Sequence, residues 1–368
     1  MQMRTTVGVA PRARRLGVFH RLRVAGVERL CADAVAVTFA VPARLAGEFA
    51  FRPGQSLTLR RWVDGREERR SYSICAPLGA APRIGVRLVP GGLVSPWLVR
   101  EVAPGDALEV APPAGGFTPE LGVPGHHVLV AAGSGVTPMV SIAASVLAGH
   151  PAARVTLLYG NRASDSVMFA DELADLKDAH PTRFQLVHVL SREPREVDVL
   201  SGRLDGQRLA TLLAALLDPR VAHHWWLCGP APMVAEARRV LLGLGVAPER
   251  VRRELFFDAD AGPAPAAREA PAAVAGPASR LTVVLDGRAS TVDLPRGERV
   301  LDGARRARPE APFACRGGVC GTCRARVTEG RAVMRRNFAL EPAEVAAGYV
   351  LTCQAEPDGE RLTVDYDG

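Results

Sequence analysis

Cysteine is the residue type whose spacing in this sequence most clearly indicates chemistry. Three cysteines stand within nine residues of the glycine-rich stretch FACRGGVCGTCRARV, which begins at Phe313. Cys315, Cys320 and Cys323 are separated by four and two residues, and Cys353 follows after a gap of 29 residues. The total of seven cysteines is odd, and nothing in the sequence indicates secretion, so a metal or redox site is favoured over a disulfide framework.

The spacing C-x4-C-x2-C, followed by a distant fourth cysteine, is the plant-type pattern for the ligands of a [2Fe–2S] cluster. Gly317, Gly318 and Gly321 would allow the sharp turns of such a loop and leave backbone N–H groups free to donate to the sulfurs. Tetrahedral zinc is the alternative, but zinc sites usually contain two CxxC pairs, and only one is present here. We therefore predict an iron–sulfur cluster, which carries one electron at a time.

A second group of residues fits a flavin. In RRSYSIC, the guanidinium of Arg70 would neutralise a pyrophosphate, the ring of Tyr72 would pack on the isoalloxazine, and Ser73 would donate near its redox nitrogen. In GGLVSPWL, glycine and serine would let a helix N-terminus meet a phosphate. The candidate flavin-binding residues are Arg70, Ser71, Tyr72, Ser73, Gly92, Leu93 and Ser95. The R-x-Y-S string alone is weak, because an exposed strand carries it by chance.

A third group fits a nicotinamide dinucleotide. In VLVAAGSGVTPM, an apolar strand meets a glycine turn, where Gly133 and Gly135 would let the backbone approach a pyrophosphate at the positive end of a helix. Thr137 suits the N-cap of that helix and Pro138 its first position. The candidate residues of this turn are Gly133, Ser134, Gly135, Thr137 and Pro138. The G-x-G-x-x-G fingerprint is absent, and a purely structural turn is the alternative.

Two later strand ends complete this group. Cys228 closes an apolar strand, where ligands of open α/β sheets bind, so the C-G-P run would lie beside the nicotinamide; a buried structural thiol is the alternative. Ser191 and Arg192, assisted by Arg162, would bind a ribose 2′-phosphate and favour NADPH over NADH. The candidate residues of these two ends are Arg162, Ser191, Arg192, Cys228, Gly229 and Pro230.

The elements that must position these residues fall into three patterns. Short strands separated by Pro and Gly predict an antiparallel flavin-binding β-barrel over 18–120, with a hairpin turn at Asp64-Gly65. Apolar strands then alternate with helices, which predicts a doubly wound, parallel-sheet NADP-binding domain over 121–257. The helices are expected near 138–149, 167–179, 205–217 and 231–244.

The remaining segments are a tail, a linker and a third domain. Residues 1–17 are expected to form a flexible basic tail, and 258–279, which are nearly all Ala, Pro and Gly, a semi-extended linker. Beyond it, 280–368 begin with a hairpin that turns at Asp286-Gly287, followed by a helix near Arg299–Arg308 and the cysteine loop. The chain is thus expected to combine α+β and α/β domains.

Composition argues against other classes of protein. The net charge is +7 and the pI about 9.4, but the arginines are scattered without interleaved aromatic residues, so no nucleic-acid partner is expected. No apolar run approaches the roughly 20 residues that span a membrane, and the basic N-terminus lacks the apolar region of a signal peptide. We therefore expect a cytoplasmic protein without a membrane partner.

Taken in order, these motifs resemble the ferredoxin–NADP reductase superfamily with a plant-type, β-grasp [2Fe–2S] ferredoxin domain fused at the C-terminus. The likeness extends from His20 to Asp367 through FRPGQSLTL, RRSYSIC, AAGSGVTPM, YGNR, GRLDG, CGPAPM, CRGGVCGTC and LEPAEVAAGYVLTCQA. Within that superfamily the sequence is most similar to the reductase subunits of multicomponent phenylacetyl-CoA epoxidases. The resemblance implies FAD as the flavin and NADPH as the electron donor. It also implies a diiron oxygenase, a component of a multicomponent monooxygenase, as the protein partner that docks at the cluster face.

The resemblance also implies roles for individual residues. Ser73, Cys228 and Glu254 would form the hydride-transfer site, and an aromatic residue, Phe256 or Phe257, would cover the flavin. Independently of the resemblance, Arg316, Arg324, Arg326 and Arg331 surround the cysteines, so the cluster face is expected to be basic and to meet an acidic patch of the partner; the alternative is that these arginines are merely solvated. The alternatives are the reductase of a Rieske-type or other diiron oxygenase, an FMN-dependent reductase, and an iron–sulfur redox sensor without reductase activity.

Overall fold

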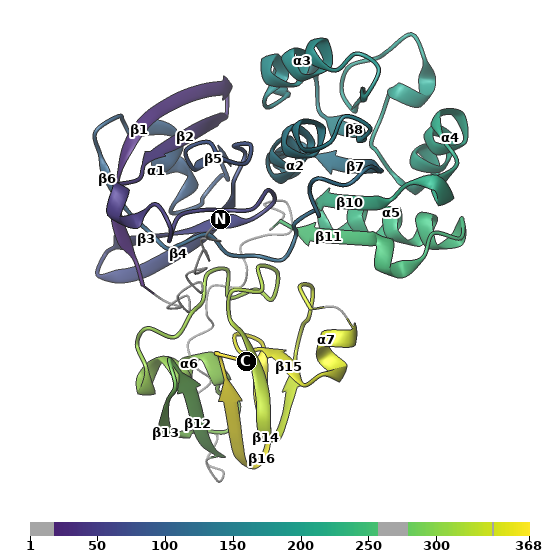
Figure 1. Cartoon of the computed structure of the whole chain (residues 1–368). Coiled ribbons are helices and arrows are strands. Elements are labelled where there is room, and N and C mark those ends of the chain that lie inside the picture. Colours follow the sequence, from purple (N-terminus) through teal and green to yellow (C-terminus); the bar gives the residue numbers. More distant parts are fainter. Residues whose placement is uncertain (1–17, 257–278, 341) are drawn as a thin grey trace, which may run out of the picture.

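The structure is a computed structural model that describes residues 18–256 and 279–368, apart from residue 341 and the side chain of residue 342. These residues form three β-sheets, each with its own hydrophobic core (Figure 1). The predicted N-terminal tail (1–17) and all of the predicted linker except Ser279, which begins a strand, lie outside the described residues.

The first sheet is antiparallel, with the strand order β4-β3-β6-β1-β2-β5. Its edge strands approach each other through a bridge between Ile74 and Ile84, so the sheet curves around a core of apolar side chains. Its elements are β1 (His20–Cys31), β2 (Ala34–Ala40), β3 (Ser56–Val63), β4 (Arg66–Ser73), β5 (Arg83–Arg87), β6 (Ala107–Val110) and the helix α1 (Ser95–Arg100). The predicted antiparallel flavin-domain fold is confirmed, although the long strand β1 was not among the predicted elements.

Both predicted hairpin turns are present, and the backbone explains their sequence. Asp64 and Gly65 join β3 to β4 with φ angles of 49° and 72°, and Asp286 and Gly287 have φ angles of 52° and 69°. Two successive residues with positive φ form the turn that matches the twist of paired strands, and Asp-Gly tolerates this conformation best.

The second sheet is parallel, with the order β11-β10-β7-β8-β9, and helices cover both of its faces. Apolar side chains of α2 and α3 pack on one face, and those of α4 and α5 on the other. The elements are β7 (His126–Ala132), α2 (Val136–Gly149), β8 (Arg154–Asn161), α3 (Ala170–Ala179), β9 (Phe184–Leu190), α4 (Gly206–Leu216), β10 (His224–Gly229), α5 (Ala231–Gly243) and β11 (Val251–Leu255). The predicted doubly wound domain is confirmed, and the chain reverses direction across the sheet between β7 and β10, where such folds bind ligands.

Two helices begin at other residues than the sequence predicted. The helix α2 begins at Val136, after a 3-10 turn at 133–135, so Thr137 is not its N-cap and Pro138 is not its first residue. Instead, the Thr137 hydroxyl lies inside the first turn and donates to the Ser134 carbonyl at 2.7 Å. The helix α3 begins at Ala170, because Phe169 is left-handed with φ 59° and interrupts the predicted segment.

The third sheet is mixed, with the order β13-β12-β16-β14-β15, and only β12 and β16 run parallel. The helix α6 packs across it, as in a β-grasp domain, and fills the segment predicted as a helix. The elements are β12 (Ser279–Leu285), β13 (Arg288–Leu294), α6 (Val300–Ala307), β14 (Arg324–Met334), α7 (Pro342–Ala346), β15 (Tyr349–Leu351) and β16 (Ala355–Asp365). Short 3-10 helices elsewhere are η1 (Ala43–Leu45), η2 (Gly133–Gly135), η3 (Ser164–Ser166), η4 (Asp198–Leu200), η5 (Pro219–Val221) and η6 (Pro248–Arg250).

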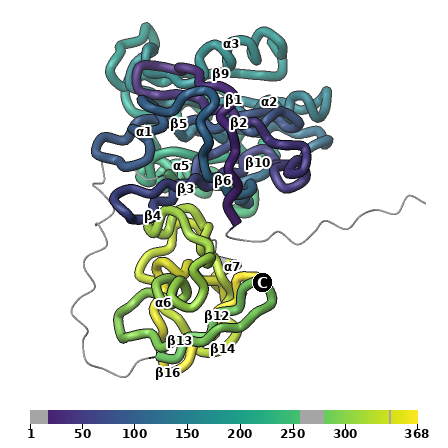
Figure 2. The backbone as a smooth tube through the Cα atoms, turned by 90° about the vertical axis from the view of Figure 1, so that its left-hand side faces the viewer, coloured from purple at the N-terminus to yellow at the C-terminus, as the bar shows by residue number. Residues whose placement is uncertain are grey.

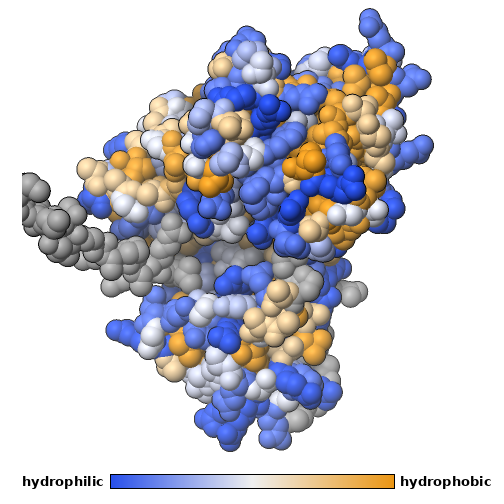
Figure 3. Space-filling model, turned by 45° about the vertical axis from the view of Figure 1, so that its right-hand side comes forward, coloured by the Kyte–Doolittle hydropathy of each residue, from blue (hydrophilic) through white to orange (hydrophobic). Residues whose placement is uncertain are grey.

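The first two domains lie side by side, and the third lies below them. Figures 1 and 2 both place loops of the third domain, above α6, against the strand β4 of the first domain. In the space-filling view, the third domain forms the lower part of the molecule (Figure 3). No helix among the described residues is long and apolar enough to cross a bilayer.

Candidate functional site

The four cysteines of the loop motif come together in the third domain as two pairs. The Cys315 thiol accepts a hydrogen bond from Cys320, which lowers the pKa of Cys315 to about 6 and, together with burial, raises that of Cys320. Cys323 and Cys353 form an equivalent pair, in which the pKa of Cys353 is lowered and that of Cys323 raised. In the described part of the chain, no three Cys, His, Asp or Glu residues converge on a single ion position. Two ligand pairs fit a two-iron centre, in which each iron takes two protein ligands, better than one tetrahedral zinc ion.

The backbone of this loop is shaped for sulfur ligands. Gly318 and Gly321 have φ angles of 81° and 66°, and Arg316 is also left-handed at 53°. The Gly317 N–H donates to the Cys315 sulfur at 3.3 Å, and the Gln354 side chain donates to the Cys353 sulfur at 3.7 Å. These contacts confirm the expected glycine turns and N–H donors, and donors of this kind stabilise thiolates. Gln354 was not predicted.

The strand β4 carries the flavin motif. Because side chains alternate along a strand, Arg70 and Tyr72 lie on one face and Ser71 and Ser73 on the other. The Tyr72 ring is partly buried against the barrel core, and burial raises the pKa of its hydroxyl, which therefore stays protonated. The Arg70 guanidinium is 42% exposed and donates to Glu68 at 2.9 Å. The strand thus offers a half-open aromatic ring and an accessible cation, as a bound flavin requires.

Ser73 and Glu254 meet at the junction of the first two domains. The Ser73 hydroxyl, at the buried end of β4, donates to a carboxylate oxygen of Glu254 in β11 at 3.1 Å. Burial raises the pKa of Glu254 to about 7, because its charge has lost hydration. The carboxyl group therefore changes charge near neutral pH beside the strand that carries the flavin motif.

Cys228 lies next to this junction, at the end of β10. It pairs across the parallel ladder with Glu254, and burial raises the pKa of its fully buried thiol. Gly135, from the turn before α2, approaches so closely that a Cβ there would lie 2.3 Å from the Cys228 carbonyl oxygen. Gly133, with φ 54°, is held by a hydrogen bond from the Tyr159 hydroxyl to its carbonyl at 3.0 Å. The predicted glycine turn and the C-G-P run therefore meet where the sheet reverses direction.

The predicted 2′-phosphate residues also lie together. Arg192, after β9, donates its backbone N–H to the Arg162 carbonyl, after β8, at 2.7 Å, and Ser191 donates its backbone N–H to Asn161 at 2.9 Å. Both arginine side chains are exposed, and no ion pair of either is present in the described ranges 18–256 and 279–368. Two cations are thus free to bind an anion at the carboxyl ends of adjacent strands.

Other predicted positions are placed less directly. The helix α1 begins at Ser95, as predicted, but the Ser95 hydroxyl accepts a hydrogen bond from the Val89 N–H at 3.0 Å. Leu93 is exposed, and Gly92 packs against Val89. Pro230 is the N-cap of α5 and directly follows Gly229, whose φ is 154°. Phe256 packs on the core of the second domain, and Phe257 lies outside the described residues.

Three family models match consecutive parts of the chain. An oxidoreductase FAD-binding domain matches residues 21–118, an oxidoreductase NAD-binding domain 129–239, and a 2Fe-2S iron-sulfur cluster binding domain 283–358. Each range lies within one of the three domains and contains most of the residues predicted for its cofactor, whereas Glu254 and Phe256 lie outside the matched ranges.

Two relatives align with this chain over nearly the whole length of both proteins. The chain is 42% identical over 354 residues to a component of the 1,2-phenylacetyl-CoA epoxidase of Escherichia coli K12, covering 95% of this chain and 98% of that protein. It is 35% identical to the ferredoxin reductase component of the 3-ketosteroid-9-alpha-monooxygenase of Rhodococcus rhodochrous, covering 94% and 96%. The structure of phthalate dioxygenase reductase has the same fold, with a TM-score of 0.56 and 23% identity over 94% of this chain and 98% of that one.

Proposed function

Because this chain belongs to the family of FAD- and NAD-dependent oxygenase reductases with a C-terminal [2Fe–2S] domain, we propose that it passes electrons from NADPH to the diiron oxygenase of a phenylacetyl-CoA epoxidase. The observation that carries this choice of acceptor is the 42% identity, over nearly the whole of both chains, to a component of such an epoxidase. The oxidoreductase chemistry does not depend on the choice. The cofactors supply it: a flavin accepts two electrons as a hydride, and the cluster takes them one at a time.

The residues of the first two domains would bind and orient the flavin and the nicotinamide dinucleotide. Arg70 would neutralise the flavin pyrophosphate, and the ring of Tyr72 would support the isoalloxazine. The backbone at Gly133 and Gly135 would admit the nicotinamide dinucleotide. Ser73 of the first domain and Cys228 of the second would help to orient the two cofactors for hydride transfer. Glu254 holds the Ser73 hydroxyl through their 3.1 Å hydrogen bond.

The preference for NADPH over NADH rests on Arg162 and Arg192. A ribose 2′-phosphate carries two negative charges, and a guanidinium binds phosphate through two parallel hydrogen bonds. NADH lacks that phosphate and gains nothing from these side chains.

The partner surface lies around the cysteine loop. Arg316, Arg324 and Arg331 form ion pairs with Asp302, Glu344 and Asp358 at 3.3, 2.8 and 3.4 Å, and Arg326 is exposed beside them. Such exposed pairs are weak, so acidic groups of a partner can replace the internal carboxylates.

Phe338 adds an apolar contact to this surface. Its side chain is 40% exposed, and its N–H donates to the Gly318 carbonyl within the loop at 3.1 Å. We therefore infer a docking surface with an apolar centre and a basic rim. The rate at which this protein reduces its partner should then fall as the salt concentration rises.

Reconstitution tests this function. The purified chain is mixed with NADPH, phenylacetyl-CoA and the oxygenase components of the Escherichia coli epoxidase, and epoxide formation is measured. In parallel, it is mixed with the oxygenase component of the 3-ketosteroid monooxygenase and its steroid. We expect product in the first mixture only. Product in the second mixture alone would identify another oxygenase as the acceptor, and the absence of NADPH oxidation even with ferricyanide would indicate a redox sensor. Extraction of the bound flavin distinguishes FAD from FMN.

A further inference from the structure

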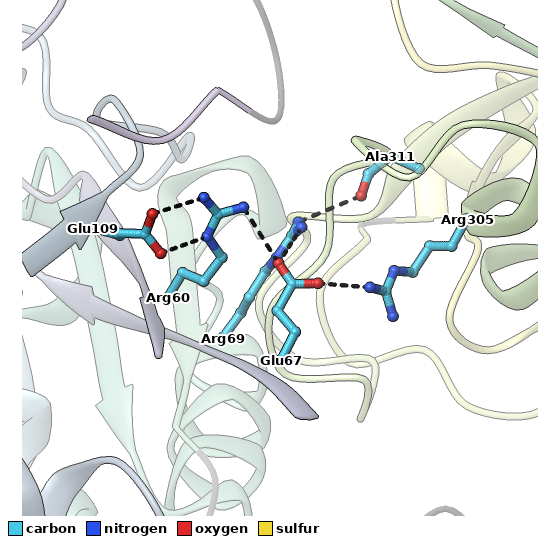
Figure 4. Close-up of polar contacts among 6 residues, drawn as sticks. All are labelled: Arg60, Glu67, Arg69, Glu109, Arg305 and Ala311. Atoms are coloured by element: carbon cyan, nitrogen blue, oxygen red, sulfur yellow. Dashed lines mark hydrogen bonds and ion pairs between the residues drawn. The ribbon is translucent and has the colours of Figure 1, made fainter. Parts of the chain in front are cut away.

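Glu67, on β4 of the flavin domain, binds three guanidinium groups, one of which comes from the third domain. Its carboxylate lies 3.5 Å from Arg60 and 2.7 Å from Arg69, both in the flavin domain, and 2.6 Å from Arg305 on α6 (Figure 4). The Glu67 side chain is 8% exposed and that of Arg69 3% exposed, so these charges have lost most of their hydration. A buried carboxylate of this kind is strongly favoured only while its cationic partners remain in place.

The same arginines hold an aromatic ring of the cysteine loop. Phe313, which is 3% exposed and two residues before Cys315, lies under the guanidinium groups of Arg69 and Arg305 at 4.1 and 4.4 Å from the ring centre. Arg69 also donates to the Ala311 carbonyl at 3.5 Å (Figure 4). Cation–π contacts are strongest when they are desolvated, as here. The carboxylate of Glu67 thus fixes two arginines, and those arginines fix the loop that carries the first cluster ligand.

The position of this network on β4 connects it to the flavin. Glu67, Arg69 and Ser73 share one face of the strand, and Arg70 and Tyr72 lie on the other. The flavin motif and the residues that hold the cysteine loop therefore lie on the same strand, a few residues apart. A second contact, Val319 of the loop against the core of the nucleotide-binding domain, adds packing but no charge pair.

The balance of charge makes Glu67 the critical member. Arg60, Arg69 and Arg305 supply three positive charges, and Glu67 and Glu109 supply two negative ones, with Glu109 bound to Arg60 at 2.9 Å. Without the charge of Glu67, the buried Arg69 and the partly exposed Arg305 would face each other across the domain interface without the carboxylate that both of them bind. The interface would change from attractive to repulsive.

We propose that Glu67 is a positioning residue that docks the ferredoxin domain on the flavin domain and thereby sets the rate of electron transfer from the flavin to the cluster. In that step one electron leaves the flavin and reduces the cluster, and no bond is made or broken. The third domain is then held at a fixed position on the flavin domain. This inference does not depend on which oxygenase receives the electrons.

Two substitutions on opposite sides of the interface test the proposal. Glu67→Gln removes the central charge, and Arg305→Gln removes the partner that the third domain contributes. Asp218→Asn is the matched control, because it breaks an exposed ion pair with Arg220 at 2.8 Å inside the nucleotide-binding domain. Each protein is mixed anaerobically with NADPH in a stopped-flow instrument, and the bleaching of the flavin and of the cluster is followed separately. NADH replaces NADPH if the latter is not a donor, so the choice of donor does not decide the result.

We expect both interface variants to reduce the flavin at the wild-type rate and to reduce the cluster about thirtyfold more slowly, as the loss of a buried, hydrogen-bonded charge pair implies. The double variant should be no slower than Glu67→Gln alone, because both changes remove one contact. Ferricyanide reduction, which draws on the flavin, should be unchanged, and the electron paramagnetic resonance signal of the cluster should match that of the wild type.

Wild-type cluster reduction in both variants would overturn the proposal, as would equal slowing of the flavin and cluster phases. If Glu67→Gln does not fold, Arg305→Gln decides alone, since Arg305 lies on the surface of α6 and is 29% exposed.

Discussion

Gly135→Ala should slow hydride transfer to the flavin by pushing two strand ends apart. Gly135 has φ −62°, an ordinary helical value, so alanine carries no conformational penalty there. Its Cβ, however, would lie 2.3 Å from the Cys228 carbonyl oxygen, 2.6 Å from the carbonyl carbon and 2.8 Å from the Gly229 nitrogen. Comfortable contacts begin at about 3.5 Å, so the turn and the end of β10 must separate by roughly 1 Å.

Two magnitudes follow from that separation. Overpacking of this kind costs about 1–3 kcal/mol of stability, because the clashing atoms are backbone and cannot rotate away. A 1 Å displacement at a reacting centre lowers the rate roughly a hundredfold. Because Cys228 and its neighbour Glu254 both lie at this end of the sheet, the substitution should lower the rate of hydride transfer more than it lowers the stability of the fold.

The assay is anaerobic stopped-flow reduction of the flavin by NADPH, with thermal unfolding as the second readout. Gly243→Ala is the matched control, because Gly243 ends α5 and a Cβ there meets nothing within 4 Å. The control should keep the wild-type rate and be as stable or slightly more stable. If Gly135→Ala transferred hydride at the wild-type rate with unchanged stability, the close approach of the glycine turn to Cys228 would have no role.

Three further predictions concern single side chains. Glu254 has a pKa of about 7, and its ionised form opposes the negative charge that hydride brings to the flavin. Flavin reduction should therefore slow as the pH rises through about 7, and Glu254→Gln should remove that dependence. An unaltered pH profile in the variant would exclude Glu254 as the source of the dependence. Arg192→Ala should lower kcat/KM for NADPH about 10- to 100-fold and leave that for NADH unchanged, and equal losses with both donors would argue against a 2′-phosphate contact. His127 lies among His126, His223, His224 and Trp226, and burial lowers its pKa to about 4 in the folded protein. As the pH falls below 6.5, the unfolded chain therefore takes up a proton at His127 before the folded chain does. The free energy of unfolding should then decrease by about 3 kcal/mol between pH 6.5 and pH 4. His127→Asn keeps an acceptor for the Trp226 N–H, now 3.1 Å from Nδ1 of His127, and should flatten this loss when unfolding temperatures are compared at pH 7 and 5.

Local signals in the sequence predicted the features that depend on neighbouring residues. The cysteine spacing predicted the ligand loop, and Asp64-Gly65 and Asp286-Gly287 predicted two turns, because only a few residue types accept positive φ. The alternation of strands and helices predicted the parallel sheet, whose order then places Gly135 against Cys228. The start of α2 was missed, since Thr137 and Pro138 are typical of a helix N-terminus and yet lie within the first turn of this one.

Features that depend on distant residues could not be predicted. Glu67 and Arg305 are 238 positions apart, and in a chain with 46 basic residues no single arginine indicates its partner. The charged run EERR lies in the strand that follows the Asp64-Gly65 turn, but no local signal shows that Glu67 and Arg69 contact the third domain. The raised pKa of Glu254 likewise arises from burial between two domains, which no local pattern records.

A comparison of two electron acceptors in Cys320→Ser tests whether paired electrons enter at the flavin and leave singly through the cluster. Ferricyanide takes electrons from the flavin, whereas cytochrome c takes them from the cluster. We expect that the variant, with one ligand of a cysteine pair removed, reduces ferricyanide at the wild-type rate and no longer reduces cytochrome c. A folded variant that had lost both activities, or had kept both, would contradict it.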